Sequence, residues 1–179
     1  MSTILSYKIH TVTPYINWIY FFHAWGFQPR YAAIANIHGC DACRAMWLAS
    51  FPVEERNKAS EAMQLFKEAN RMLDVLDRDY EVRTIFKLCK ANSDGDNLVI
   101  EKAENQFMVF PLLRQQTPKK DGSPFLCLSD FIRPLSSGIP DTLGAFASSI
   151  DADMEGLYEQ DPYKHLLVQT LSDRLAEAA

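Results

Sequence analysis

The sequence has no apolar run long enough to cross a membrane. The longest early stretch, from Tyr15 to Trp25, is interrupted by Asn17 and His23, and a membrane-spanning helix needs about 20 apolar residues. The N-terminus also lacks a basic region followed by an apolar core and a small-residue cleavage site, which together mark a secretory signal. From these absences we expect a cytoplasmic protein with no membrane partner.

The sequence has no cluster of basic residues. The 18 basic residues occur singly or in pairs, and the formal net charge is −5. Nucleic-acid-binding proteins typically carry a clustered basic surface, so the sequence predicts no nucleic-acid partner. A chain of 179 residues, 47% of them apolar, is long enough to bury a core, and we predict a single domain over residues 1–179.

Cysteine is scarce, with four residues in the chain, and in the cytoplasm all four are expected to be thiols. Cys40 and Cys43 have the spacing of half a zinc site or of a redox pair. His38 could be a third ligand, but no second cysteine pair or suitably spaced histidine pair completes the set. We therefore interpret them as small apolar residues and predict no metal site. Cys89 and Cys127 occur in strand-like runs and are expected in the core.

The sequence also shows no recognisable set of residues for nucleophilic catalysis. No Ser/His/Asp or Cys/His arrangement stands out, and the histidines share no common spacing along the chain: His10, His23, His38 and His165. The sequence therefore predicts no catalytic residue.

Hydrophobic periodicity is strongest between Glu54 and Asp79. Apolar residues recur there at three- and four-residue spacing among charged ones, which is typical of an amphipathic helix. They are Ala59, Ala62, Met63, Phe66, Ala69, Met72, Leu73 and Leu76.

A buried helix is expected over residues 14–25. Thr13 can cap it, Pro14 suits the first helical position, and Gly26 is placed to end it. Residues 26–53 have no sustained period, and we interpret them as irregular chain with a single helical turn.

Three strand-like segments follow one another at residues 82–91, 98–100 and 107–113. The polar break between the first two contains Asp94-Gly95, which indicates a hairpin, so the three segments predict an antiparallel meander. A fourth strand is expected over residues 143–150, after a polar loop at 117–124.

The two ends of the chain complete the pattern. Residues 151–179 predict two helices with a break near Asp161-Pro162, and residues 3–12 predict a short strand or arm. Helices, sheet and helices therefore occur in blocks, which indicates an α+β fold with an antiparallel sheet flanked by helices.

Several segments occur in one fixed order late in the chain: Leu113-Arg114-Gln115-Gln116, Cys127-Leu128-Ser129-Asp130-Phe131-Ile132, Pro134-Leu135-Ser136-Ser137-Gly138 and Leu143-Gly144-Ala145-Phe146-Ala147. They are accompanied by Tyr15-Ile16-Asn17-Trp18 near the start and Leu171-Ser172-Asp173-Arg174-Leu175-Ala176-Glu177-Ala178 near the end. This order resembles the reactivation module of cobalamin-dependent methionine synthase, which binds S-adenosylmethionine. The resemblance spans most of the chain and implies a C-shaped α+β domain with a twisted antiparallel sheet.

The resemblance implies a role in methionine biosynthesis, in the reductive methylation of cobalamin. In that family the module presents S-adenosylmethionine to cob(II)alamin carried by another domain, while flavodoxin or a related reductase supplies an electron. Cobalamin would therefore be bound only by a partner protein. Such a module orients the methyl donor and needs no nucleophile of its own. We expect a component of a cobalamin-dependent methyltransferase that is not catalytic alone.

Two positions match ligand-contacting residues of the family, Asn17 and Glu177. The family has an acidic residue at the position of Asn17, and losing its charge-assisted hydrogen bond to the ligand's ammonium group costs about 1–3 kcal/mol. The family's Arg-Pro-x-x-Gly-Tyr-Pro segment, which grips the ligand, has no counterpart here. The resemblance thus covers an N-terminal half-module, and we expect a partner chain or a second copy of this chain to supply the remainder.

The resemblance also places four residues toward the cobalamin-binding partner: Arg114, Gln115, Gln116 and Asp130. An alternative is that the first three satisfy backbone groups where a strand ends and that Asp130 fixes a bend. Asn17 is likewise either a pocket residue or a polar group on a helix face. The alternative function is accordingly a non-catalytic binding or interaction protein that kept the fold and lost the ligand site.

Overall fold

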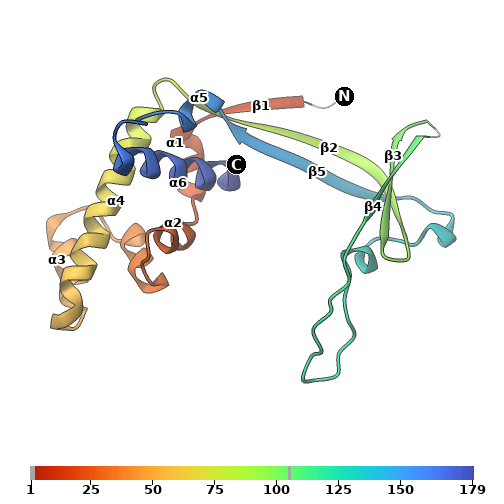
Figure 1. Ribbon diagram of the computed structural model, residues 1–179, viewed down its shortest axis with the longest axis horizontal. Coiled ribbons are helices and arrows are strands. Elements are labelled where there is room, and N and C mark those ends of the chain that lie inside the picture. Colours follow the sequence, from red (N-terminus) through yellow and green to blue (C-terminus); the bar gives the residue numbers. More distant parts are fainter. Residues whose placement is uncertain (1–2, 105) are drawn as a thin grey trace. The chain divides into compact units, whose positions relative to one another are not determined.

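The computed structural model describes residues 3–104 and 106–179, which fall into two compact units (Figure 1). The helical unit comprises residues 4–84 and 148–179, and the sheet unit comprises Thr3 and residues 85–147. The fold is α+β with an antiparallel open sheet, as the block order of the sequence predicts. Within the described ranges, no helix combines the length and the apolar character needed to span a membrane.

The helical unit contains two long helices, α4 (Arg56–Leu76) and α6 (Pro162–Ala178). The shorter helices are α1 (Ile9–Val12), α2 (Trp18–Ala24), α3 (Asp41–Ala49) and α5 (Ala152–Glu155). Short 3₁₀ helices connect them at Thr13–Tyr15, Pro29–Asn36 and Val53–Glu55. The helix predicted between Glu54 and Asp79 and the break near Pro162 are confirmed.

The core of the helical unit is formed mainly by α4, α6 and α2. The buried stripe of α4 consists of Ala59, Ala62, Leu65, Ala69, Met72, Leu73 and Leu76. α6 contributes Leu167, Val168, Leu171 and Leu175, and α2 contributes Phe21 and Phe22. Both phenylalanines are completely buried, so the prediction of a buried α2 holds for this face, whereas Ile19 and Tyr20 are exposed.

The predicted start of the helix over residues 14–25 is wrong. The Thr13 hydroxyl donates to a carbonyl oxygen of the preceding turn at 2.9 Å, so it does not cap the next helix, and the chain makes only a 3₁₀ turn there. The α-helix begins at Trp18, with Asn17 as its N-cap. Gly26 follows it with a φ of +74°, a left-handed conformation that commonly ends a helix.

Residues 26–53 contain more helix than predicted, namely the 3₁₀ helix Pro29–Asn36 and the nine-residue α3. Aromatic contacts hold this region together. The rings of Tyr31 and Phe51 stack with centroids 5.3 Å apart, and Trp47 meets Phe51 edge-on at 4.9 Å. Because these rings come from separate segments, hydrophobic periodicity along the chain does not reveal the arrangement.

The sheet contains β1 (Thr3–Lys8), β2 (Glu81–Asp94), β3 (Asn97–Ala103), β4 (Gln106–Pro111) and β5 (Asp141–Ile150). The strand order is β1-β2-β3-β4, and β5 returns to pair with β2. The predicted meander is confirmed, because β2, β3 and β4 pair antiparallel in sequence order. Gly95 occupies the first central position of the β2–β3 turn with a φ of +58°, where a type II′ turn requires glycine.

The segment between β4 and β5 is fastened to the end of β2. The Ser93 backbone N–H donates to the Arg133 carbonyl at 3.0 Å, and the Ser93 hydroxyl donates to the Ile132 carbonyl at 2.9 Å. Cys127 is buried as predicted, but it precedes the 3₁₀ helix Leu128–Phe131 rather than lying in a strand. Cys89 lies in β2 and is half-buried.

Candidate functional site

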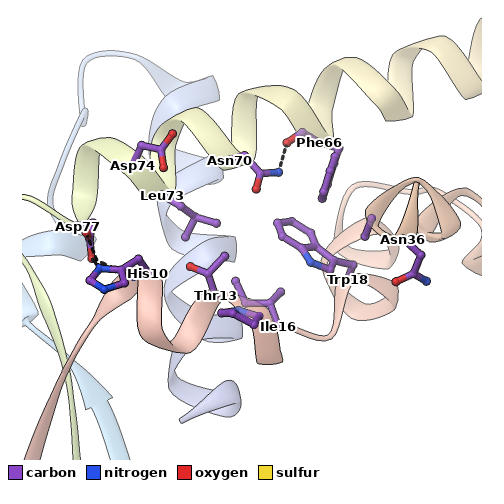
Figure 2. A pocket seen from close by; sticks show the side chains of 12 residues that line it. His10, Thr13, Ile16, Trp18, Asn36, Phe66, Asn70, Leu73, Asp74 and Asp77 are labelled. Atoms are coloured by element: carbon purple, nitrogen blue, oxygen red, sulfur yellow. Dashed lines mark hydrogen bonds and ion pairs between the residues drawn. The ribbon is translucent and has the colours of Figure 1, made fainter. Parts of the chain in front are cut away.

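Two adjoining hollows lie in the helical unit, lined by residues of the α1–α2 segment, the 3₁₀ helix Pro29–Asn36 and, for the first, α4. Figure 2 shows the first of them. The first measures about 360 Å³ and the second about 380 Å³, and Asn17 lines the second. They share four lining residues: Ile16, Trp18, Ala35 and Asn36. Each volume is near the lower end of the range of about 300–1,000 Å³ that is usual for small-molecule sites.

Asn17 is positioned by its role as the N-cap of α2. Its side-chain Oδ1 accepts a hydrogen bond from the backbone N–H of Ile19 at 3.2 Å, and the side chain is exposed. The amide oxygen keeps a second lone pair, so the side chain can offer both this oxygen and its NH₂ group to a ligand, but neither carries a charge. An aspartate at this position would have a second oxygen available for an ammonium group while the first caps the helix.

Glu177 lies in the last turn of α6 and is exposed. Its Oε2 accepts a hydrogen bond from Nη1 of Arg174 at 2.6 Å, and the Arg174 guanidinium lies over the ring of Tyr20 on α2, 5.7 Å from its centroid. The Arg174 side chain therefore links the carboxylate of Glu177 to the helix that Asn17 caps. The next residue, Ala178, lines a separate hollow of about 380 Å³.

Trp18 forms the wall that the two hollows share. Its ring meets Phe66 of α4 edge-on at 4.8 Å and Phe21 at 5.3 Å, and the residue is half-buried. The expectation of a buried helix is therefore met at Phe21, whereas Trp18 also borders space that a ligand could enter (Figure 2).

A hydrogen-bonded pair, His10 and Asp77, lines one end of the first hollow (Figure 2). The His10 ring nitrogen Nδ1 lies 2.9 Å from Asp77 Oδ2, and the His10 backbone N–H donates to Oδ1 at 2.9 Å. Burial alone would raise the pKa of Asp77, but the two hydrogen bonds from His10, together with the electrostatic effect of His10 and Lys8, hold the pKa below its usual value. Sequence reasoning missed this pair, because the two residues are 67 positions apart.

Arg114 lies at the centre of a charged cluster in the sheet unit. Its guanidinium donates to both oxygens of Asp130 at 2.7 Å and to Asp96 Oδ1 at 2.7 and 3.0 Å. A further bond joins it to the Phe125 carbonyl at 2.7 Å. Asp96 belongs to the β2–β3 turn, so Arg114 ties that hairpin to the segment after β4. The sequence analysis did not predict that Asp96 belongs to this cluster. Its position in the predicted hairpin turn was the one feature that could have indicated a role.

Asp130 is further oriented by the Cys127 backbone N–H, which donates to it at 2.8 Å. The hydrogen bonds from Arg114, followed by the one from Cys127, lower the pKa of Asp130 to about 2. Gln115 and Gln116 bind backbone groups of their own loop. The Gln115 side chain accepts from the Leu126 N–H at 3.2 Å, and the Gln116 side chain donates to the Arg114 carbonyl at 2.7 Å.

The six residues singled out by the sequence thus fall into two groups. Asn17 and Glu177 belong to the helical unit, where α2 and α6 carry them. The other four, Arg114, Gln115, Gln116 and Asp130, belong to the sheet unit and are linked through the Arg114 cluster and the loop backbone. The first group adjoins hollows of ligand size, and the second forms a polar, hydrogen-bonded surface feature.

Comparison with known proteins identifies a matching family and a similar solved structure. The sequence profile of the family described as "Vitamin B12 dependent methionine synthase, activation domain" matches residues 8–179. Among solved structures, the chain is similar to the "Crystal Structure of the MetH Reactivation Domain bound to AdoHcy", with 34% sequence identity and a TM-score of 0.72. The match covers 99% of this chain and 52% of that one, so the chain spans about half the length of this neighbour.

Proposed function

The chain belongs to the activation-domain family of vitamin B12-dependent methionine synthase, and from this premise we propose that it assists the reductive methylation of cob(II)alamin by S-adenosylmethionine. The single observation that carries the proposal is the family match over residues 8–179. The similarity to a reactivation domain bound to AdoHcy, the demethylated product of that methyl donor, supports it. In this proposal a partner protein binds cobalamin, and the reductive methylation takes place in the cytoplasm.

The chemistry assigns a positioning task to this chain. One electron from a flavodoxin-type reductase and the methyl group of the sulfonium convert cob(II)alamin to methylcobalamin and leave S-adenosylhomocysteine. The protein residues need only hold the amino acid and nucleoside parts so that the methyl group faces the cobalt, which is an effect of orientation. No catalytic side chain is required, and we assign none.

Asn17 and Glu177 are the proposed ligand contacts of this chain. Asn17 adjoins a hollow of suitable size and presents its amide group on an exposed side chain. Glu177 supplies a carboxylate, which could receive the ligand's ammonium group if its bond to Arg174 is exchanged. Because the Asn17 oxygen already caps α2, we expect this chain alone to bind S-adenosylmethionine weakly.

Further ligand contacts are proposed to come from residues outside these 179. The neighbouring reactivation domain has nearly as much chain again as the part that matches. In this chain the sheet unit exposes large apolar side chains that a partner would cover: Phe86, Leu88, Phe107, Val109, Leu113, Phe131 and Phe146. Exposed apolar residues in such number are typical of an interaction surface. We propose that the sheet unit, with the Arg114 cluster, contacts the cobalamin-binding component.

Titration calorimetry tests the ligand site. Heat of binding is measured for S-adenosylmethionine and S-adenosylhomocysteine, with the chain alone and with the cobalamin-binding component of methionine synthase added. We expect weak binding alone and tighter binding in the mixture. Asn17→Asp should strengthen binding about fivefold, because a charge-assisted hydrogen bond exceeds a neutral one by about 1 kcal/mol at an exposed site. Asn57→Asp, which makes the same change at an exposed position of α4 that lines neither hollow, is the matched control and should leave binding unchanged.

The role of Glu177 needs its own pair of variants. Glu177→Gln removes the charge and keeps the shape, so it should weaken binding of S-adenosylmethionine. Asp173→Asn makes the same change at an exposed position on the same helix and should leave binding unchanged. Equal effects of the two variants would contradict a specific contact at Glu177.

The alternative function is an interaction protein that kept the fold and lost the ligand. It is favoured by the fact that Asn17 and Glu177 are both already hydrogen-bonded within the chain. No heat at millimolar S-adenosylmethionine, with or without the cobalamin-binding component, would establish this alternative if the two proteins still associate. Light scattering of the chain alone then distinguishes a monomer from a second copy acting as the partner.

A further inference from the structure

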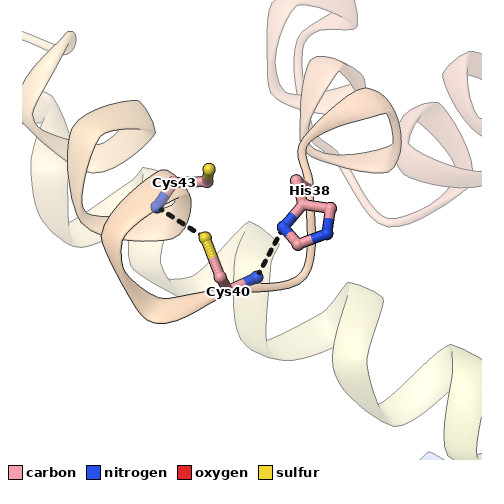
Figure 3. A group of neighbouring side chains, drawn as sticks. All are labelled: His38, Cys40 and Cys43. Atoms are coloured by element: carbon pink, nitrogen blue, oxygen red, sulfur yellow. Dashed lines mark hydrogen bonds between the residues drawn. The ribbon is translucent and has the colours of Figure 1, made fainter.

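His38, Cys40 and Cys43 bring three metal-binding atoms together at the start of α3 (Figure 3). One ring nitrogen and the two Sγ atoms all lie within 4.8 Å of one another. None of the three residues lines the hollows described above. The cluster is therefore separate from the proposed ligand site, and its test is independent of the proposed function.

The local fold accounts for this convergence. Cys40 is the N-cap residue of α3, and its Sγ accepts a hydrogen bond from the Cys43 backbone N–H at 3.3 Å. Cys43 lies one turn further along, so both sulfur atoms belong to the first turn of the helix (Figure 3). The His38 ring folds back over this turn and accepts a weak hydrogen bond at 3.4 Å from the Cys40 backbone N–H.

Exposure argues against the interpretation of these cysteines as buried apolar residues. Cys40 is exposed and Cys43 is half-buried, so the expectation from the sequence is wrong for Cys40. Cys127, by contrast, is buried as expected. The Cys43 N–H that points at the Cys40 sulfur would also favour a thiolate over a thiol there, and a thiolate is the form that binds metal.

The donor atoms select a class of metal. Thiolate and imidazole suit Zn²⁺ and related thiophilic ions, whereas Ca²⁺ and Mg²⁺ take oxygen ligands. Two thiolates and a neutral imidazole also balance the double charge of Zn²⁺. In a tetrahedral zinc site neighbouring donors lie about 3.5–3.8 Å apart, so each of the three separations has to shorten by about 1.3 Å at most. Rotation of the exposed side chains of His38, which accepts a long hydrogen bond, and of Cys40 can bring the donors closer.

We propose that His38, Cys40 and Cys43 form a three-ligand site for a thiophilic metal ion of the Zn²⁺ class. Within the described ranges the cluster comprises three donors, so the fourth tetrahedral position is open to water or to a donor from another molecule. The bound ion fastens the His38 segment to the first turn of α3.

Cobalt(II), a coloured substitute for Zn²⁺, provides the direct test on the full 179-residue chain, reduced and free of oxygen. We expect one equivalent to bind with a sulfur-to-cobalt charge-transfer band, and one equivalent of Zn²⁺ to abolish the band by displacement. Cys40→Ser and Cys43→Ser should remove the band. His38→Ala, which lies outside α3 and leaves the helix intact, should weaken affinity about 10-fold or more, because even loss of a supporting residue typically costs roughly 10–100-fold. Cys89→Ser is the matched control and should bind as the unaltered chain does.

Two results would overturn the proposal. One is the absence of the charge-transfer band in the reduced chain, or its persistence in Cys40→Ser or Cys43→Ser. The other concerns a dithiol redox pair, the competing use of this spacing. When the chain is exposed to air with one equivalent of Zn²⁺, mass spectrometry should find both thiols protected. A Cys40–Cys43 disulfide formed despite the zinc would replace the metal site with a redox pair.

Discussion

The cap that Asn17 places on α2 can be separated from its proposed ligand contact by substitution. Asn17→Ala removes the acceptor of the Ile19 N–H, and loss of such a cap typically costs about 1 kcal/mol. The hydrogen bond is 3.2 Å long, at the long end of the usual range, and the residue is exposed, so we expect about 0.5–1 kcal/mol. Asn17→Asp keeps the cap and adds negative charge at the helix N-terminus, which contributes about 0.3–1 kcal/mol.

Tryptophan fluorescence is the appropriate assay, because all three tryptophans, Trp18, Trp25 and Trp47, lie in the helical unit. Thermal unfolding followed in this way reports on that unit alone. A loss of 1 kcal/mol lowers Tm by about 3–5 °C for a unit of this size. Asn17→Ala should therefore melt about 2–5 °C below the unaltered chain. Asn17→Asp should melt at the same temperature or higher at neutral pH.

The reasoning is refuted if Asn17→Ala melts at the same temperature as the unaltered chain, or if Asn17→Asp is as unstable as Asn17→Ala. Either result would mean that the Asn17 oxygen does not cap α2. The stability measurements also allow the affinities of these variants for S-adenosylmethionine, measured by calorimetry, to be interpreted. An affinity change in Asn17→Asp without loss of stability comes from the ligand contact rather than from a damaged helix.

Three further predictions concern charge and packing. Asp130 should titrate by NMR with a pKa of about 2, and this pKa should rise in Arg114→Gln but stay below its usual value, because the Cys127 N–H still donates to the carboxylate. Since the folded pKa is depressed, the contribution of Asp130 to stability is present above about pH 4 and lost as the pH falls toward 2. An unchanged pKa in the variant would contradict the pairing. Leu171→Ala should lower the free energy of unfolding of the helical unit by about 2–5 kcal/mol, because the leucine side chain is completely buried. Denaturation followed by tryptophan fluorescence measures this loss. A loss below about 1 kcal/mol would contradict the described core. His10→Ala removes the ring but keeps the backbone N–H that donates to Asp77, so the pKa of Asp77 should rise part of the way toward its usual value. Because that pKa is depressed in the folded chain, the stability that Asp77 contributes is lost on acidification, and the variant should lose less of it. An NMR titration in which the pKa of Asp77 does not rise would contradict the bond from the His10 ring.

The sequence was most informative where structure is local. The periodicity of α4 is confirmed because one face of an amphipathic helix must be apolar whatever it packs against. The Asp94-Gly95 turn is confirmed because few residues tolerate the backbone conformation of a tight hairpin. The start of α2 was wrong because Thr13-Pro14 is a common helix signal, and only the folded chain shows the Thr13 hydroxyl bonded backward.

The candidate site was accessible from the sequence only through the family resemblance. Nothing in the spacing of Asn17 and Glu177 relates them, since they lie at opposite ends of the chain. They become related because Arg174, which holds Glu177, lies over Tyr20 in the helix that Asn17 caps. The hollows beside Asn17 are likewise formed by segments distant in sequence.

By itself, the sequence determined the block order of helices, sheet and helices, the long helix, the hairpin and the family. These features depend on local periodicity, turn chemistry and residues in a fixed order, which can all be read along the chain. Only the tertiary structure decided that Arg114 pairs with Asp96, that His10 pairs with Asp77, and that the oxygen of Asn17 caps α2. Such contacts depend on the path of the chain through space, because the energy of a hydrogen bond or ion pair depends on the distance between atoms and not on their separation in sequence.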